Sequence, residues 1–438
     1  MRTPRFVGVS LVAGLVLSAT AACGGGDDGG EETASADLKG VTLEVAGPWS
    51  AGGGEQTNFQ KVLDGFAAKT GAKVNFTSNG DTLITVLSSK IPGGGQPDVA
   101  MMPNQGAIND FAKKGWLKPL AQDAQKATDE NFAPIWKTLG TVDGTQYAVY
   151  FKAANKSTVW YRPKAFEDAG VQPPATWADW VKSAQTIADS GVAPLSIAGA
   201  DGWTLTDWFE NVYLSQAGPE NYDKLAKHEI PWTDGTVKTA LKTLAELWGK
   251  KEFINGGQPG ALSTDFPTSV VNTFKDPAKA AMVYEGDFVS GVIGENTDAK
   301  VGTDALFFPF PAVGSTAPVV SGGDAAVVLK DSEGAQELVE YLASPEAAEL
   351  WAENGGMVSP NKNLDLAVYP DEIQRSIAKS VIDAGDNVRF DMSDLAPASF
   401  GGTKGAGEWK ILQDFLKNPA DVDGAAEALE KAAAKAYE

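Results

Sequence analysis

The densest group of chemically capable side chains lies between residues 203 and 211 of this 438-residue sequence. Trp203 to Asp207 is one helical turn and Asp207 to Asn211 is another, so a helix would place these three side chains on one face. Trp208 adds a second aromatic ring beside the acid. Carboxylates and amides bind hydroxyl groups, and flat rings cover apolar faces, so the group suits a ligand that has both. The alternative is a core tryptophan beside a solvated acid.

Polar residues also follow each of three segments that read as strands early in the sequence. Trp49 and Glu55 flank a glycine-rich loop, which lacks a following Lys–Ser/Thr pair and is therefore not a phosphate loop. Asp81 follows an Asn-Gly pair, and Gln105 follows the strand-like residues 99–102. The structural alternatives are a surface loop for Glu55 and a helix N-cap for Asp81.

Three more groups occur in the second half of the sequence. Glu285 and Asp287 follow a buried strand, where either carboxylate can accept a hydrogen bond from a hydroxyl. Gly323 and Asp324 would bring backbone amides close to a ligand, or would form a turn. The third group supplies a base, a ring and two acids and comprises Arg389, Phe390, Asp391 and Asp394. Its alternative is a surface loop in which the base and the acids pair with one another.

The amino-acid composition argues against several classes of site and function. The one cysteine, Cys23, excludes an intrachain disulfide and a cysteine-based zinc or iron–sulfur cluster. The one histidine, His228, lies in a charged stretch that reads as solvated surface, which nearly removes histidine-dependent enzymes. The formal charge of −21 argues against nucleic-acid binding, which needs basic patches. The sequence predicts no metal site and no cofactor.

Alternating strand and helix patterns must position these groups. From residue 41 onward, segments with an apolar residue at every second position alternate with segments whose apolar residues recur at helical spacing. This pattern predicts a β-α-β-α-β order and a largely parallel sheet covered by helices. Such sheets bind ligands beyond the carboxyl ends of their strands, so the loops after residues 45 and 102 are the expected places. The predicted strands are residues 41–45, 74–76 and 99–102, and the predicted helices are 59–66 and 83–87.

A second region of strands and helices begins near residue 146. Its predicted strands are residues 146–151, 158–161, 280–284, 305–309 and 325–329. The predicted helices are residues 177–188, 237–248, 335–343, 345–353 and 425–437. The fold class is therefore α/β, and the length suits two domains or one two-lobed body.

The N-terminus has the pattern of a signal peptide followed by a flexible tether. Residues 1–22 combine two arginines, an apolar run too short to span a bilayer, and small residues, as a signal peptide does. The sequence TAAC at residues 20–23 resembles a lipobox, which predicts that Cys23 becomes the lipidated first residue. The alternative is a plain signal peptide with an incidental cysteine. Residues 23–37 are small and polar and predict a flexible tether.

Three phrases, taken in order, resemble the carbohydrate-binding extracellular solute-binding proteins of ABC importers, family 1. The first is VWYRP at residues 159–163, followed by FEDAG and PATW. The second is AMVYEGD at residues 281–287, and the third is SPEA at 344–347 followed by NGGMVSPN. Within this group, residues 203–208 and 389–394 look most like the α-glucoside-binding members.

The resemblance implies a two-lobed periplasmic-binding-protein-like fold of type II, with a hinge and with sugar bound between the lobes. Carried onto this sequence, lobe 1 is expected to comprise residues 38–150 plus 316–361. Lobe 2 is expected to comprise residues 151–315 plus 362–438. The predicted ligand-binding residues are Trp49, Glu55, Asp81, Gln105, Trp203, Asp207, Trp208, Glu285, Asp287, Gly323, Asp324, Arg389, Asp391 and Asp394.

The resemblance also implies a function. The expected protein is a monomeric, non-enzymatic receptor anchored outside the cytoplasm by lipid on Cys23, which closes on a carbohydrate and delivers it to an ABC permease. An α-glucoside such as a di- or oligosaccharide is the expected ligand. Because the 57 acidic residues offer many carboxylate pairs, a secreted glycoside hydrolase is the alternative, although no motif isolates such a pair.

Overall fold

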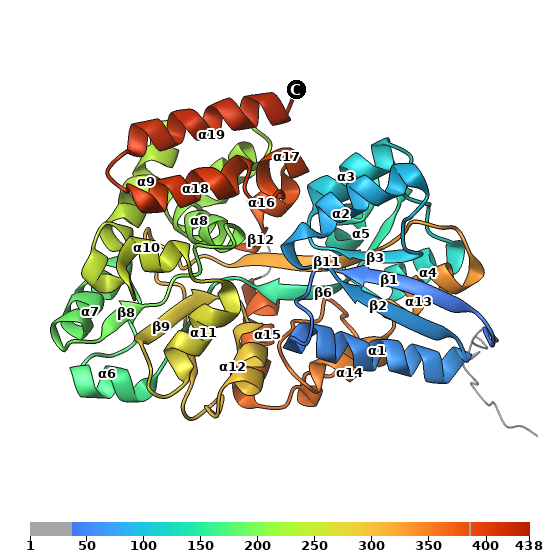
Figure 1. The fold of residues 1–438 in the computed structure, drawn as a ribbon, viewed down its shortest axis with the longest axis horizontal. Coiled ribbons are helices and arrows are strands. Elements are labelled where there is room, and N and C mark those ends of the chain that lie inside the picture. Colours follow the sequence, from blue (N-terminus) through green and yellow to red (C-terminus); the bar gives the residue numbers. More distant parts are fainter. Residues whose placement is uncertain (1–36, 385–386) are drawn as a thin grey trace, which may run out of the picture. The chain divides into compact units, whose positions relative to one another are not determined.

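Two separate β-sheets, each covered by helices, organise the chain in the computed structural model, which describes residues 37–384 and 387–438 (Figure 1). The α/β class predicted from the sequence is confirmed. The predicted signal peptide of residues 1–22, the predicted lipidation at Cys23 and nearly all of the predicted tether lie outside the described residues.

The first sheet has six strands in the order β12-β11-β3-β1-β2, with β6 paired to β11. Its strands are β1 (Thr42–Gly47), β2 (Lys73–Ser78), β3 (Val99–Met102), β6 (Ala148–Asn155), β11 (Val320–Val328) and β12 (Arg389–Phe390). The β1, β2 and β3 strands are parallel, as the β-α-β-α-β pattern predicts. The sheet as a whole is mixed, because β11 runs antiparallel to both β3 and β6, and this corrects the expectation of a largely parallel sheet.

Helices cover both faces of the first sheet because successive residues of each strand point to opposite faces. Leu43 and Val45 of β1 pack into the core under α1 and α14, whereas Ala46 packs under α2 and α3 (Figure 1). The helices of this part are α1 (Gly54–Thr70), α2 (Leu83–Lys90), α3 (Gln105–Lys113), α4 (Gln122–Asn131), α5 (Pro134–Leu139), α13 (Glu333–Leu342) and α14 (Pro345–Ala352). Two short 3-10 turns, η1 (Gly80–Thr82) and η2 (Ile91–Gly93), flank α2, and a small hairpin pairs β4 (Thr141–Val142) with β5 (Thr145–Gln146).

The second sheet has four strands in the order β10-β7-β9-β8. These are β7 (Thr158–Tyr161), β8 (Ala193–Leu195), β9 (Ala280–Glu285) and β10 (Leu306–Pro309). Its earlier helices are α6 (Pro163–Ala169), α7 (Trp177–Asp189), α8 (Trp203–Ala226), α9 (Gly235–Trp248), α10 (Gly257–Leu262), α11 (Phe266–Phe274) and α12 (Val289–Asn296). The later helices are α15 (Glu372–Ala384), α16 (Met392–Leu395), α17 (Ala398–Gly401), α18 (Gly407–Lys417) and α19 (Val422–Ala436), with 3-10 turns η3 (Lys251–Phe253) and η4 (Leu366–Val368).

The helix α8 carries the residue group that the sequence singles out, and it is buried on nearly every side. Its Trp208 is 1% exposed and stacks on Trp180 of α7 with ring centroids 5.3 Å apart. The Tyr284 ring of β9 also contacts Trp208, with ring centroids 4.6 Å apart. Trp208 is therefore a core residue, which is the alternative that the sequence left open.

One strand leads directly from the first sheet into the second. After β6 ends at Asn155, only Lys156 and Ser157 separate it from β7. The chain returns to the first sheet through β11, whose Val320 and Ser321 pair with β12. The short strand β12 belongs to the range assigned to lobe 2 and yet joins the first sheet, so it lies where the two parts meet. The predicted lobe ranges themselves stay a prediction.

Most other predicted elements are present with their ends shifted by a few residues. The sequence did not predict several helices, among them α3, α4, α11, α12, α15 and α18, and it placed the end of β6 four residues too early. Among the described helices, none combines the length and the apolar character needed to cross a membrane.

Candidate functional site

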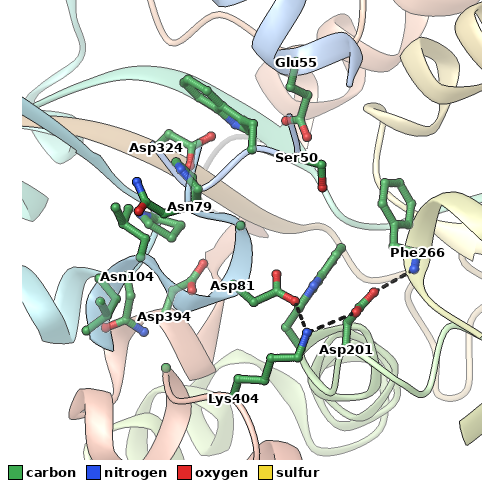
Figure 2. Close-up of a pocket in the computed structure, with 18 of the residues that line it drawn as sticks. Ser50, Glu55, Asn79, Asp81, Asn104, Asp201, Phe266, Asp324, Asp394 and Lys404 are labelled. Atoms are coloured by element: carbon green, nitrogen blue, oxygen red, sulfur yellow. Dashed lines mark hydrogen bonds and ion pairs between the residues drawn. The ribbon is translucent and has the colours of Figure 1, made fainter. Parts of the chain in front are cut away.

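A cavity of about 490 Å³ opens between residues of the first sheet and residues of the second (Figure 2). The loops after β1, β2 and β3 contribute from one side, as expected for the carboxyl ends of parallel strands. Residues near the start of α8 and α11 and in α16 contribute from the other side. Its principal polar and aromatic residues are Trp49, Ser50, Glu55, Asn79, Asp81, Asn104, Lys152, Lys156, Asp201, Trp203, Asp265, Phe266, Phe288, Asp324, Asp394, Lys404 and Trp409.

Lys152 organises the carboxylates on the first-sheet side of the cavity. Its Nζ lies 2.8 Å from Glu55 Oε1 and 2.7 Å from Asp324 Oδ2, and its side chain is 5% exposed. Burial alone would lower the pKa of Lys152, but the two carboxylates raise it above its usual value, so the ammonium stays charged. The lysine therefore holds two acids at the cavity wall in a fixed geometry (Figure 2 labels both acids).

Lys156, four residues after Lys152, likewise pairs with acids, which come from α8 and from the segment around α16. Its Nζ lies 3.3 Å from Asp207 Oδ1 and 3.7 Å from Asp394 Oδ2, and it donates a short hydrogen bond to Asp391 Oδ2. Burial alone would lower the pKa of Lys156, but these carboxylates raise it well above its usual value. Of the three acids, only Asp394 lines the cavity. The Lys156 ammonium also lies 5.7 Å from the ring centroid of Trp203, a cation–π contact that orients this ring.

Two acids behind Lys156 are held in an environment that favours their neutral forms. Burial raises the pKa of Glu285 to about 8 and that of Asp207 well above its usual value. Neither carboxyl oxygen of Glu285 has a hydrogen-bond donor among the described residues. A proton held by the Glu285–Asp207 pair lets one acid donate to the other, which gives a partner to two of the three oxygens of this pair that otherwise lack one. Burial also raises the pKa of Asp287 to about 7, although the Asn155 N–H donates to its Oδ1 at 2.6 Å.

A lysine bridges the two sides of the cavity in Figure 2. Lys404 Nζ lies 2.8 Å from Asp81 Oδ2, which follows β2, and 3.6 Å from Asp201 Oδ1, which precedes α8. The Phe266 N–H donates to Asp201 Oδ2 at 2.6 Å. Burial and the Asp81 carboxylate raise the pKa of Asp201 to about 6. The two sides also meet where Asn104 Nδ2 donates to the Ser393 carbonyl at 3.2 Å.

Aromatic rings supply the apolar part of the cavity wall. Trp203 packs against Phe266 and Phe288 with ring centroids 5.6 Å and 6.1 Å apart. Trp49 is 4% exposed and packs 4.7 Å from Phe59, so most of its ring belongs to the core and only part of it faces the cavity. Rings beside carboxylates form the combination that binds a ligand with hydroxyl groups and apolar faces.

The structure divides the residues predicted from the sequence into two equal sets. The cavity is lined by Trp49, Glu55, Asp81, Trp203, Gly323, Asp324 and Asp394. The cavity lining does not include Gln105, Asp207, Trp208, Glu285, Asp287, Arg389 or Asp391. The ligand-binding role of the first set stays a prediction.

The residues of the second set have other surroundings. Gln105 lies in the first turn of α3 and donates through Nε2 to the Leu139 carbonyl at 3.4 Å. Arg389 Nε pairs with Asp223 Oδ1 of α8 at 2.7 Å, so this arginine contacts an acid that lies far away in the sequence. Asp391 is fully buried and caps α16, accepting a hydrogen bond from the Asp394 N–H.

Sequence reasoning missed the lysines and two acids of the cavity wall: Lys152, Lys156, Lys404, Asp201 and Asp265. A signal was present for the first two. They lie four residues apart in the segment AVYFKAANK, where a period of two places both on one face of an apolar strand. A buried lysine needs a paired carboxylate, so this pattern indicates a buried ion-pair site.

Asp207, Glu210 and Asp391 bring carboxylate oxygens within 4.8 Å of one another, a grouping that could suggest a metal site. Lys156 contacts the two aspartates. Glu210 accepts hydrogen bonds from the Tyr222 hydroxyl at 2.6 Å and from the backbone N–H groups of residues 392 and 393. These donors already occupy oxygens that a cation would need, so the residues do not fit a metal ion.

The fold and the cavity define a class of protein. The bacterial solute receptor AcbH, which prefers β-D-galactopyranose, superposes with a TM-score of 0.79 at 22% identity, over 91% of this chain and 100% of that chain. At this identity the likeness establishes the fold, which is the two-lobed α/β fold of periplasmic binding proteins.

The sequence comparisons establish the family. The chain belongs to the bacterial extracellular solute-binding proteins, whose family model matches residues 52–349. It is 32% identical to the osmoprotective compounds-binding protein of Synechocystis sp., over 93% of this chain and 94% of that protein. It is 34% identical to the alpha-glucosides-binding periplasmic protein of Rhizobium meliloti, over 89% of this chain and 86% of that protein. These relatives are binding proteins rather than enzymes, so they lend no support to a glycoside hydrolase, and the family implies a location outside the cytoplasm.

Proposed function

We propose that this protein is the sugar receptor of an ABC importer and that it binds an α-glucoside, a di- or oligosaccharide, in the 490 Å³ cavity. The observation that carries the proposal is the cavity wall itself, which combines fixed carboxylates with tryptophan and phenylalanine rings. Charged acceptors bind hydroxyl groups with roughly 1.5–3 kcal/mol each, about twice the strength of neutral pairs. The name of the Rhizobium meliloti relative supports the choice of α-glucosides.

The sugar also supplies the signal for delivery. A ligand that contacts both sides of the cavity stabilises the closed arrangement, and only such differential affinity shifts the equilibrium between open and closed forms. Moving this equilibrium from 1:99 to 99:1 takes about 5.5 kcal/mol, which a few charged hydrogen bonds supply. The permease then recognises the closed form.

The test is a titration by calorimetry with maltose, trehalose, cellobiose and xylobiose, followed by analysis of the sugars recovered after long incubation. We expect saturable binding of an α-glucoside and a sugar that stays intact, with a stabilisation of about 2.7 kcal/mol at a hundredfold excess over Kd. Release of glucose would favour a hydrolase, and a flat titration with every sugar would remove the proposal.

A tryptophan variant tests the position of the binding site. Trp203→Ala removes the half-buried ring that faces the cavity, and we expect it to weaken binding of the best sugar at least tenfold, or about 1.4 kcal/mol. Trp116→Ala is the matched control, because Trp116 is also half-buried but does not line the cavity. Equal affinities of the two variants would contradict the assignment.

We also propose that lipid on Cys23 anchors the receptor to the membrane surface after the signal peptide of residues 1–22 is removed, and that the receptor works as a monomer. The lone cysteine directly after small residues supports this proposal. In a membrane fractionation, the wild type should sediment with the membranes and Cys23→Ala should remain in the supernatant. Both forms in the same fraction would contradict the anchor.

A further inference from the structure

The charges of the cavity wall are unbalanced in favour of acids. Among the described residues, the lining holds six carboxyl groups and three ammonium groups, and it holds no arginine. The carboxyl groups belong to Glu55, Asp81, Asp201, Asp265, Asp324 and Asp394. The ammonium groups belong to Lys152, Lys156 and Lys404.

All three ammonium groups already pair with carboxylates, and two of them, Lys152 and Lys156, are largely buried. Lys152 has two carboxylates within 2.8 Å, Lys156 has three within 3.7 Å, and Lys404 has two within 3.6 Å. An ammonium has three N–H donors, so these partners use most or all of them. The side chains of Lys152 and Lys156 are 5% and 12% exposed, so neither can turn toward a ligand without leaving its acids unpaired in the interior.

An anionic ligand would therefore meet twice as many carboxyl groups as ammonium groups, and each ammonium is already paired with carboxylates. The remaining side-chain donors at the wall, such as Asn79, Asn104 and Ser50, are neutral. Removing a charge from water is costly unless the charge is paired. A neutral hydroxyl, in contrast, donates to a fixed carboxylate with a net gain.

We propose that the cavity selects its ligand by charge: it binds uncharged sugars and rejects the corresponding sugar acids, and Lys152 is the positioning residue that fixes Glu55 and Asp324 as hydroxyl acceptors. This inference rests on the proposed function and deepens it, because it names a class of sugar that the site excludes. The lysines of the wall thus hold acceptors in place, and they do not receive anionic groups.

The test uses two analogues of the best neutral α-glucoside that differ only in charge. In one analogue the primary alcohols are oxidised to carboxylates, and in the other these carboxylates are converted to carboxamides of the same size. At pH 7.5 the carboxamide should bind at least tenfold more tightly than the carboxylate. A carboxylate bound as tightly as the carboxamide, or a carboxamide bound as poorly as the carboxylate, would overturn the proposal, because shape would then set the preference.

A variant tests the electrostatic origin of the ratio. Glu55→Gln leaves Lys152 and Asp324 as a neutral pair, so the carboxamide-to-carboxylate ratio should fall severalfold. Glu349→Gln, an exposed position on α14, is the control and should keep the wild-type ratio. An unchanged ratio in Glu55→Gln would contradict the proposal. If neutral glucosides bind and only the ratio fails, the inference fails alone; if no neutral glucoside binds, the proposed function fails and the inference with it.

Discussion

Replacing Lys156 with methionine is expected to lower the free energy of unfolding at pH 8 by about 3–5 kcal/mol, the usual cost of removing one partner from a buried ion pair. The Lys156 side chain is 12% exposed and contacts Asp207, Asp391 and Asp394. Methionine keeps most of the stem and removes only the charge. The loss therefore reports buried acids left without their counter-ion.

The same variant should be less impaired in acid. At pH 5 the unpaired carboxyl groups can take up protons, which relieves their repulsion, so the difference from wild type should shrink. Urea unfolding at both pH values measures the effect. Lys404→Met is the control: the Lys404 side chain is 44% exposed, and a surface pair contributes about 0–1 kcal/mol. A Lys156→Met variant as stable as Lys404→Met at pH 8 would contradict the buried-pair account.

Replacing Glu285 with glutamine is expected to remove a large part of the pH dependence of stability. The pKa of Glu285 is about 8 in the folded protein, against a reference value of 4.5. A raised folded pKa contributes stability that is fully present below the unfolded pKa and is lost as the pH rises through the folded pKa. This loss approaches about 1.4 kcal/mol per pH unit in the middle of the window from pH 5 to pH 8 and is smaller at its ends, so it is on the order of 3 kcal/mol in all.

The glutamine variant has no such group to ionise. Relative to wild type, Glu285→Gln should therefore gain stability steadily between pH 5 and pH 8, with the largest advantage at the upper end. Unfolding curves at four pH values across this window measure the trend. Glu349→Gln is the matched control, because its side chain is exposed on α14, and its curve should run parallel to wild type. Parallel curves for both variants would show that Glu285 is ionised at neutral pH in the folded protein.

The periodic parts of the fold were readable from the sequence. Leu43 and Val45 alternate with polar residues and form β1, and Phe59, Val62 and Phe66 repeat at helical spacing and form α1. Because the carboxyl ends of parallel strands meet at one edge, the loops after β1 and β3 were also placed correctly at the cavity.

The candidate site was only half readable, and helix α8 shows why. Trp203 and Asp207 share a face, as their spacing predicts, yet Trp203 lines the cavity while Asp207 lies behind it against Lys156. Periodicity gives the face of a helix, but it cannot give the depth along that face when the helix is buried on nearly every side. Trp208 entered the core for the same reason.

The lysines escaped prediction for a different reason. The role of Lys152 in the cavity wall depends on its ion pairs with Glu55 and Asp324. These acids lie far away in the sequence and meet Lys152 only when β6 pairs with β11 beside the start of α1. Strand pairing between distant segments is a tertiary property that no local pattern contains. The only local signal of this ion-pair site in the sequence was the pair of lysines on one face of an apolar strand.

The crystal structure of the protein with its best-binding α-glucoside tests the central claim most directly. The account predicts sugar density inside the 490 Å³ cavity, with a sugar ring against Trp203 and with hydroxyl groups within hydrogen-bond distance of the carboxylates that Lys152 and Lys156 hold. Sugar bound elsewhere on the molecule, with this cavity empty at a saturating concentration, would contradict it.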